Sequence, residues 1–544
     1  MNLIKNNFFK ISFICLLFCV CVLSCKKKES QIIEEQVENE ITTFTFFSAD
    51  SNISDKFTDM IAKIITEKTG VKLEIYGPEG DPADEIDLML AQGTYPDFIY
   101  AKGDLPKLIE ANVVIPLDNF IEKNGANVKK LYGDQLSRLK YTVENPSIYS
   151  LCAYEIKTKK YETSGTMQIQ HNVLKEFGYP RITTLEEYEN ILYAYKNKYP
   201  TINGKKTVGL SLNTAGWYWL LSLSNPGNFV LGYQDDGQWI VNQETLEAQY
   251  KFLHPEMHTF YKWLNKMYHL GLLDPESFTQ TEEQWREKIK NGNVLGTSFP
   301  LWGLKELNAK LISTDMGGHS FAFLPVTASS EIKDPSLKDY GFSGGWGMSI
   351  TSSCKNQDLA FKFLDWFCSE EAQILVNWGV KDIHYAIDEN GKRYETTTIP
   401  GVAGIGKWTY PFPQAGSGYL DSTGNPFVKS NEDSILRNYS FVEKETLNAY
   451  GVKMWTDLFP SSQELGVSSY GQVWLYPLPP NTIDLVDRAD AFVKQSIIQM
   501  VIGDKEDFDS AWKNMQQGLQ EMGIEKAEKE LTQLIKSRMD FWEN

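Results

Sequence analysis

The sequence contains few of the residues and motifs from which catalytic and metal centres are usually built. Its 544 residues include six histidines and seven cysteines. HExxH, P-loop and helix-opening GxGxxG motifs are absent. His254 and His258 have the i, i+4 spacing of a two-histidine metal site, but Pro255 between them would break a helix interior. We therefore expect no metal site there and no cofactor in the chain.

Three cysteines remain beyond residue 25, namely Cys152, Cys354 and Cys368. Their odd number and wide spacing fit neither a disulfide framework nor the CxxC spacing of a metal site. We expect buried thiols at all three positions. The sequence leaves open whether two of them form a bridge.

Basic residues are also in deficit, with 53 Lys and Arg against 71 Asp and Glu and a formal net charge of −18. Nucleic acid requires a basic surface, so this balance argues against a nucleic-acid partner. Beyond residue 25, no run approaches the roughly 20 apolar residues that span a bilayer. We expect no membrane-spanning segment in the mature chain.

The first residues, by contrast, have the layout of a secretory signal peptide. Lys5 and Lys10 precede a short apolar run over residues 11–20, and Ser24-Cys25 follows that run. The pair Ser24-Cys25 resembles a bacterial lipobox, in which the cysteine becomes the lipidated first residue. An ordinary signal peptide and an uncleaved anchor are the alternatives.

This layout predicts how the start of the chain is processed. We expect residues 1–24 to be removed as a lipoprotein signal peptide and Cys25 to carry the lipid. Residues 25–41 are acidic and without aromatics, and they are predicted to form a tether. The protein would then be held at the extracytoplasmic face of a membrane. Whether that membrane is the inner or the outer one is left open.

The chain after the tether shows the alternation typical of a parallel α/β sheet. β-Prone runs and helical patterns follow one another at 43–47, 57–65, 71–75, 84–92 and 97–101. Ser54 is placed to cap the first helix and Gly70 to end it. Because ligands of such sheets bind beyond the carboxyl ends of the strands, we select Asp50, Tyr100, Lys102 and Asp104 as candidate contacts.

Several segments together resemble one family, the lipoprotein solute-binding components of carbohydrate ABC importers (extracellular family 1, oligosaccharide-binding type). The best match runs from Gly344 to Tyr385 and contains Gly-Gly-Trp-Gly-Met-Ser-Ile, a helix and His384-Tyr385. Weaker matches lie at residues 56–73, 93–97, 172–178, 184–188 and 502–509. Their order along the chain carries the resemblance.

The resemblance implies an α/β fold of two lobes, periplasmic-binding-protein-like of type II, with a ligand cleft and a hinge between the lobes. Lobe 1 would comprise residues 42–153 plus 300–385, and lobe 2 the mostly helical residues 154–299 plus 386–544. Relatives that bind alginate oligosaccharides carry a calcium loop. The matching residues 198–205 lack the carboxylates that such a loop needs, so we expect no calcium there.

Aromatic residues make up 13% of the chain, which fits saccharide binding because rings pack against the apolar faces of sugars. Trp346, Trp302 and Trp217 are candidate ligand contacts, with core packing as the alternative. Asp50 and Asp104 could equally cap helices. By the resemblance, Glu155 lies in a segment that crosses between the lobes. Trp378 and Tyr385 lie near the expected hinge, and these three residues complete the candidate set.

The sequence therefore predicts a monomeric, lipid-anchored binding protein without catalytic residues. It would capture an oligosaccharide and deliver it to the membrane subunits of an ABC-type permease. Two alternatives remain open: a surface glycosidase or polysaccharide lyase that uses two close carboxylates, and a receptor of the same fold for a peptide or another polar solute.

Overall fold

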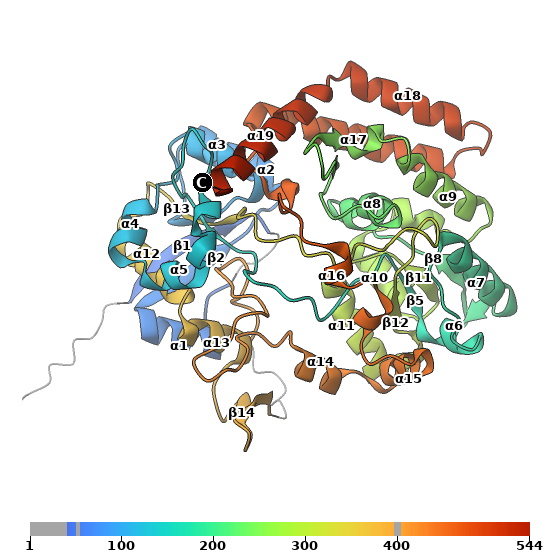
Figure 1. Cartoon of the computed structure of the whole chain (residues 1–544), viewed down its shortest axis with the longest axis horizontal. Coiled ribbons are helices and arrows are strands. Elements are labelled where there is room, and N and C mark those ends of the chain that lie inside the picture. Colours follow the sequence, from blue (N-terminus) through green and yellow to red (C-terminus); the bar gives the residue numbers. More distant parts are fainter. Residues whose placement is uncertain (1–40, 51–54, 397–403, 544) are drawn as a thin grey trace, which may run out of the picture. The chain divides into compact units, whose positions relative to one another are not determined.

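Two larger β-sheets organise the part of the chain that the computed structural model describes, residues 41–50, 55–396 and 404–543 (Figure 1). The predicted signal peptide, Cys25 and almost all of the tether lie outside these residues, as does Ser54. Within the described ranges, none of the helices is long and apolar enough to cross a membrane.

The first sheet has five strands in the order β2 (Val71–Tyr76), β1 (Thr42–Ser48), β3 (Phe98–Tyr100), β13 (Gly347–Ile350) and β4 (Leu151–Cys152). Strand β1 pairs in parallel with β2 and β3, as the alternation of strands and helices predicted. Strand β13 arrives from far along the chain and runs antiparallel to both β3 and β4.

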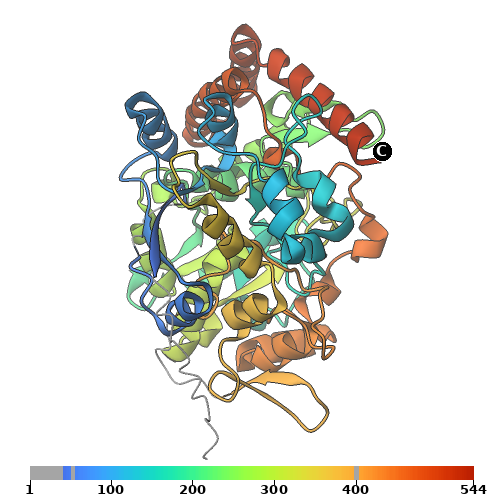
Figure 2. The same ribbon diagram turned by 90° about the vertical axis from the view of Figure 1, so that its left-hand side faces the viewer.

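Both faces of this sheet are covered because alternate residues of each strand point to opposite sides. Phe46 and Tyr100 belong to one buried cluster, and Phe47 and Ile99 to another. Helix α12 packs against α4 and α5, so segments more than 200 residues apart lie side by side (Figure 2). The helices of this lobe are α1 (Met60–Thr69), α2 (Pro82–Gln92), α3 (Leu105–Glu110), α4 (Asp118–Asn124), α5 (Ala126–Tyr132), α12 (Gln357–Phe367) and α13 (Glu370–Trp378).

Helix α1 ends at the predicted residue but begins later than predicted. Gly70 takes a left-handed conformation (φ 69°), and its N–H bonds to the carbonyl of Thr66. The helix starts at Met60, where the Asp59 side chain accepts a hydrogen bond from the N–H of Ala62. Phe57 therefore precedes the helix, and the apolar spacing that it shares with the helix was a misleading guide to its start.

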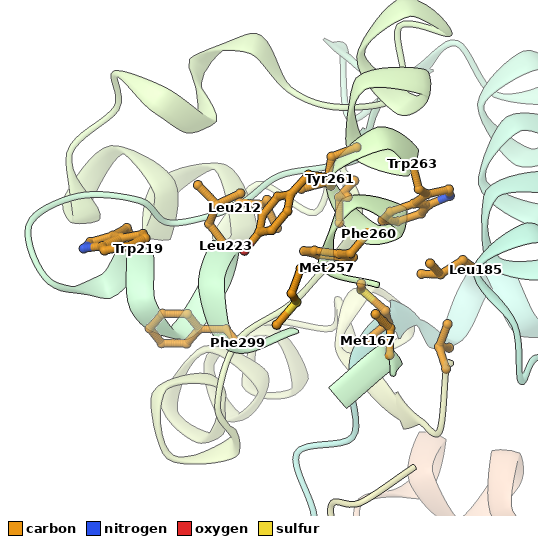
Figure 3. Close-up of a cluster of buried hydrophobic side chains, with 14 of the residues drawn as sticks. Met167, Leu185, Leu212, Trp219, Leu223, Met257, Phe260, Tyr261, Trp263 and Phe299 are labelled. Carbon is orange, nitrogen blue, oxygen red and sulfur yellow. The ribbon is translucent and has the colours of Figure 1, made fainter. Parts of the chain in front are cut away.

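The second sheet has four strands in the order β12 (Phe321–Leu324), β5 (Met167–Gln170), β11 (Val294–Thr297) and β8 (Val208–Leu210). Strand β5 is antiparallel to β11 and β12, and β11 is parallel to β8. A large aromatic and aliphatic core fills the space between this sheet and its helices (Figure 3). Tyr261, Phe260 and Trp263 of α9 contribute to that core.

Most of the helices belong to the second sheet and its core. They are α6 (His171–Glu176), α7 (Leu185–Lys198), α8 (Asn225–Val230), α9 (Met257–His269), α10 (Glu282–Lys290), α11 (Leu301–Ser313), α15 (Phe441–Tyr450), α17 (Pro480–Ile502), α18 (Phe508–Glu521) and α19 (Glu525–Glu543). The described chain also contains two short helices, α14 (Glu432–Asn438) and α16 (Ser462–Leu465). It contains three two-stranded hairpins: β6 (Thr201–Ile202) with β7 (Lys205–Lys206), β9 (Trp239–Val241) with β10 (Ala248–Tyr250), and β14 (Tyr385–Ile387) with β15 (Arg393–Glu395).

Two segments that cross between the sheets are tied to each other. Residues 153–166 lead from β4 to β5, and residues 325–346 lead back from β12 to β13. Lys160 in the first segment donates to the carbonyl of Ser336 in the second (3.1 Å) and lies 3.9 Å from the centre of the Tyr340 ring. The lobe boundaries given above stay a prediction; strand β12, from within 300–385, pairs with β5 of the second sheet. Below, the first lobe means the first sheet with the helices packed on it, and the second lobe means the second sheet with its helices, α11 included.

Candidate ligand-binding cleft

The carboxyl ends of β1 and β3 place an ion pair at one edge of the first sheet. Asp50 follows β1, and Lys102 opens the short 3-10 turn after β3, with a left-handed backbone (φ 51°). The strands are parallel neighbours, so their ends meet. Lys102 Nζ pairs with the Asp50 carboxylate, and about a quarter of each side chain is exposed, at 25% and 26%. Asp50 and Lys102 therefore lie at the sheet edge where the sequence placed them, and ligand contact there stays a prediction.

Two tryptophans occupy the corresponding place in the second lobe. Trp217 lies in the loop after β8, and Trp302 lies in the first turn of α11, directly after β11. Strands β8 and β11 are parallel neighbours, so both rings follow the same edge of the sheet. The rings are nearly parallel (17°) with centroids 6.4 Å apart, and they are 47% and 56% exposed. Such exposure is unusual for side chains of this size.

Lys102 joins the two lobes at this point. Its ammonium lies 5.6 Å from the centre of the Trp217 ring, a cation–π distance. Tyr218 stacks on Trp217 with centroids 4.6 Å apart, and burial together with the carboxylates of Glu282 and Asp50 raises the pKa of Tyr218 to about 12. The structure therefore brings Asp50, Trp217 and Trp302, three predicted contacts, into one group.

A second aromatic group contains Trp346. Its ring lies 5.0 Å from that of Trp474 and 6.4 Å from that of Tyr154, and these two partners are 5.5 Å apart. Each of the three rings is partly exposed. The Gly103 backbone comes so close that a Cβ built there would lie 3.9 Å from Trp346 Cζ2. Because Gly103 follows Lys102, the second group continues directly from the first.

Two tyrosines, Tyr100 and Tyr410, connect these two groups. The hydroxyls of Tyr100 and Tyr410 are hydrogen-bonded, and Tyr410 also packs against Tyr154 at 6.2 Å. Burial, with Asp50 nearby, raises the pKa of all three tyrosines well above 10. Their hydroxyls stay protonated at physiological pH and can donate as well as accept hydrogen bonds.

The remaining predicted contacts lie in different surroundings. Glu155, next to Tyr154, keeps solvent-exposed surface, and the protein packed around its carboxyl partly desolvates that group and raises its pKa. Asp104 pairs with Lys107 at 3.0 Å, and burial raises its pKa. Trp378 is fully buried and packs with Tyr385 (6.2 Å) beneath Arg393, a group separate from the rings described above. Ligand contact by these four residues stays a prediction.

Sequence reasoning missed Tyr154, Tyr218, Tyr410 and Trp474 as members of the group. Tyr218 was available as a signal because it adjoins Trp217, and Tyr154 because it adjoins Glu155 in the crossing segment. Tyr410 and Trp474 lie in loop-rich parts of the chain where no periodicity or motif distinguishes them. They reach the group only through long-range folding.

One motif was also overlooked. Gly341 to Gly345 reads Gly-Phe-Ser-Gly-Gly, which has the GxSxG spacing of a nucleophile elbow. An elbow joins a strand to a helix, whereas this segment leads into strand β13. Ser343 is only 3% exposed. The serine therefore lacks the setting and the access that a nucleophile requires.

No grouping of three or more histidine, cysteine or acidic side chains in the described ranges could hold a metal ion. Residues 198–205 match the position of the calcium loop of alginate-binding relatives. Here the chain forms the small β6–β7 hairpin, whose second strand is Lys205–Lys206. His258 instead bonds to Asp509 (2.7 Å), and His254 lies before the start of α9. The expectation of no metal stays a prediction.

A polar cavity of about 1010 Å³ lies elsewhere, between the β9–β10 hairpin and α19. Amide and charged side chains such as Asn242, Gln249 and Glu528 dominate its lining. It lacks the exposed indole rings that distinguish the cleft group. We therefore take the aromatic group as the candidate binding site.

Exposed rings and an ion pair from both lobes meet at one place, the arrangement expected of a solute-binding protein. Residues 60–379 match the family model described as bacterial extracellular solute-binding protein, so the chain belongs to that family. This confirms the predicted family and the two-lobed α/β fold class.

Two curated relatives carry the comparison further. The fructooligosaccharide ABC transporter substrate-binding protein FusA of Streptococcus pneumoniae serotype 4 is 24% identical in an alignment of 368 residues that covers 62% of this chain. The match spans 63% of the length of FusA, less than two thirds. Lipoprotein LipO of Bacillus subtilis strain 168 is 21% identical over 392 residues, covering 69% of this chain and 73% of LipO.

Solved structures show the same fold over most of the chain. An EF-hand mutant of S. pneumoniae FusA in complex with fructo-nystose superposes with a TM-score of 0.65 at 18% identity, covering 92% of this chain and 100% of FusA. An HMO-binding, ABC-transporter-associated solute-binding protein from Bifidobacterium longum infantis gives 0.63 at 15% identity, covering 91% and 99%.

Proposed function

We propose that this protein captures an oligosaccharide in the cleft between its lobes and delivers it to an ABC-type permease. The observation that carries the proposal is the pair of exposed rings, Trp217 and Trp302, beside the Asp50–Lys102 ion pair. Aromatic faces match the apolar faces of sugar rings, and the charged pair with the tyrosine hydroxyls matches sugar hydroxyls. FusA and the HMO-binding protein, which share the fold, support a saccharide ligand.

Binding without catalysis is the second part of the proposal. A glycosidase needs two carboxylates placed on either side of the scissile bond. In the candidate site, Asp50 is already paired with Lys102, and the Glu155 carboxylate accepts a hydrogen bond from the Thr158 hydroxyl (3.2 Å). The relatives are binding proteins as well.

The family is extracellular, and we propose that a lipid on Cys25 holds this monomeric protein outside the membrane. Ser24-Cys25 and the lipoprotein relative LipO support the anchor. Expression in a bacterial host should yield a membrane-bound protein whose N-terminal peptide carries the mass of a lipid. The Cys25→Ser variant should lack that mass and leave the membrane fraction; equal membrane retention of both forms would refute the anchor.

The saccharide itself can be found by calorimetric titration of residues 26–544. The panel should contain fructooligosaccharides, milk-type oligosaccharides and uronic-acid oligosaccharides, with products analysed in the same samples. Saturable binding with the saccharide recovered intact supports the receptor. Shortened products would instead establish an enzyme. Absence of heat with every saccharide, followed by binding of a peptide, would assign the cleft to another class of solute.

A further inference from the structure

The last helix of the chain belongs to one lobe along most of its length. Thr532 of α19 accepts a hydrogen bond from the N–H of Ala248 (2.9 Å), and Glu528 accepts one from the N–H of Tyr250 (2.9 Å). Leu531 and Ile535 are completely buried in the core of the second lobe. These contacts hold the helix on the β9–β10 hairpin.

The final turns of the same helix bind the other lobe. Arg538 Nη1 donates to the carbonyl of Tyr141 (2.7 Å), and its Nη2 donates to the carbonyl of Arg138 (3.2 Å). Both carbonyls lie in the segment after α5, whose Leu139 is part of the first-lobe core. Figure 1 shows the end of α19 beside the elements of that lobe.

Contacts between cations and aromatic rings add to this interface. The Arg138 guanidinium lies 4.3 Å from the centre of the Trp542 ring, and Lys140 Nζ lies 5.0 Å from that of Phe541. Arg538 itself is 5.0 Å from the Tyr476 ring and only 4% exposed. Because separation of the lobes would break both hydrogen bonds of Arg538 and these ring contacts together, the contact resists opening.

Residues of this contact and residues of the candidate site line the same small cavity. A small cavity of about 40 Å³ is lined by Lys102, Gly103 and Trp346 from the first lobe and by Tyr476 and Arg538 from the second. Any rotation that moves Trp346 away from Trp474 must therefore also act on the contact made by Arg538.

We propose that the end of α19, from Arg538 to Trp542, is a latch that holds the lobes closed and sets how often the cleft opens. The latch regulates the site of the proposed function and rests on that function only for its biological meaning. Since a ligand's apparent affinity scales with the population of the binding-competent state, loss of the latch lowers affinity without removing a ligand contact.

Small-angle X-ray scattering of the ligand-free soluble fragment, residues 26–544, tests the latch without any saccharide. Arg538→Ala should increase the radius of gyration, whereas Arg488→Ala, an exposed arginine of α17 within one lobe, should leave it unchanged. Trp542→Ala is a second variant that weakens the same contact but keeps the buried Arg538 side chain in place. It should expand the protein in the same direction while circular dichroism shows folded protein.

Once a saccharide is known, its dissociation rate should rise about tenfold in Arg538→Ala, with little change in the association rate. Unchanged scattering of both folded latch variants would overturn the latch and leave the proposed function standing. An expanded variant in a protein that binds no saccharide would uphold the latch and refute the function.

Discussion

Lys102 lies on the ring of Trp217 at 5.6 Å, although the two residues come from different lobes. The same ammonium pairs with Asp50. A single side chain therefore links the end of the first sheet to the exposed indole rings that follow the second sheet. A ligand that packs on Trp217 meets this pair at once. The relationship explains why ring contacts and polar contacts should act together in binding.

Removal of the Trp217 ring should weaken saccharide binding by tenfold or more, because central aromatic contacts dominate binding energy. Trp217 is 47% exposed and outside the packed core, so Trp217→Ala should change the melting temperature little. Titration calorimetry measures the first effect and thermal unfolding the second. Phe441→Ala removes an 81% exposed ring from a distant surface and is the matched control. Equal affinities of all three proteins would exclude Trp217 as a contact.

Trp302 and Trp378 should respond in opposite ways to substitution. Trp302 is 56% exposed in the cleft group, so Trp302→Ala should reduce affinity and spare stability. Trp378 is fully buried and its Nε1 donates to the carbonyl of Pro426 (3.2 Å), so Trp378→Phe should cost roughly 1–3 kcal/mol of unfolding free energy. Its saccharide affinity should match the parent protein. A marked loss of affinity in folded Trp378→Phe would instead support the ligand contact that the sequence predicted for Trp378.

Asp236 should make stability fall as pH rises toward neutrality. It is buried, and burial raises its pKa from 3.8 to about 7, even though Gln234 and Tyr470 donate to it. The folded protein therefore retains a proton that the unfolded chain releases between about pH 4 and 7, and folding is disfavoured as pH increases through that window.

The Asp236→Asn variant cannot ionise, and the Tyr470 hydroxyl can accept from the new amide. Relative to the parent, its unfolding free energy should rise by on the order of 2 kcal/mol or more between pH 4 and pH 8. Denaturant titrations across this range measure the difference. Asp484→Asn, at an exposed position of α17, should run parallel to the parent. Parallel curves for Asp236→Asn as well would show that this carboxyl ionises normally.

The three thiols should be inert in the native protein. Cys152, Cys354 and Cys368 are free and at most 4% exposed, and burial raises their pKa values, to about 12 for Cys152 and about 11 for Cys354. Thiolate is the reactive form, so a thiol reagent at pH 8 should label none of them in the folded fragment 41–544 and all three in denaturant. Ser510→Cys, at an exposed position, should react at once. Fewer than three thiols after unfolding would reveal a disulfide.

Much of the first lobe was predictable because its signals are local. The order β1, α1, β2, α2, β3 follows from apolar periodicity over short windows, and Gly70 ends α1 as its freedom at positive φ implies. The start of α1 was predicted wrongly, since Phe57 continues the apolar spacing without being helical. Periodicity reports which side chains face a core and does not determine where a helix begins.

The candidate site was predictable in part for the same reason. Asp50 and Lys102 follow neighbouring parallel strands, and parallel strands bring such residues to one edge. Trp302 stood out as a ring at the end of an expected strand and Trp217 as part of an aromatic run, but their nearly parallel arrangement depends on the pairing of β8 with β11. No local pattern encodes that pairing.

By itself, the sequence determined the predicted export signal, the acidic balance, the α/β alternation and the family, since each is written in neighbouring residues or in the order of segments. Only the tertiary structure decided which rings come together at the candidate site. Tyr100 and Tyr410 bond across 310 residues of chain, and Arg538 reaches Tyr141 across 397. Such contacts depend on the packing of both lobes, because the packed cores fix the positions from which distant side chains meet.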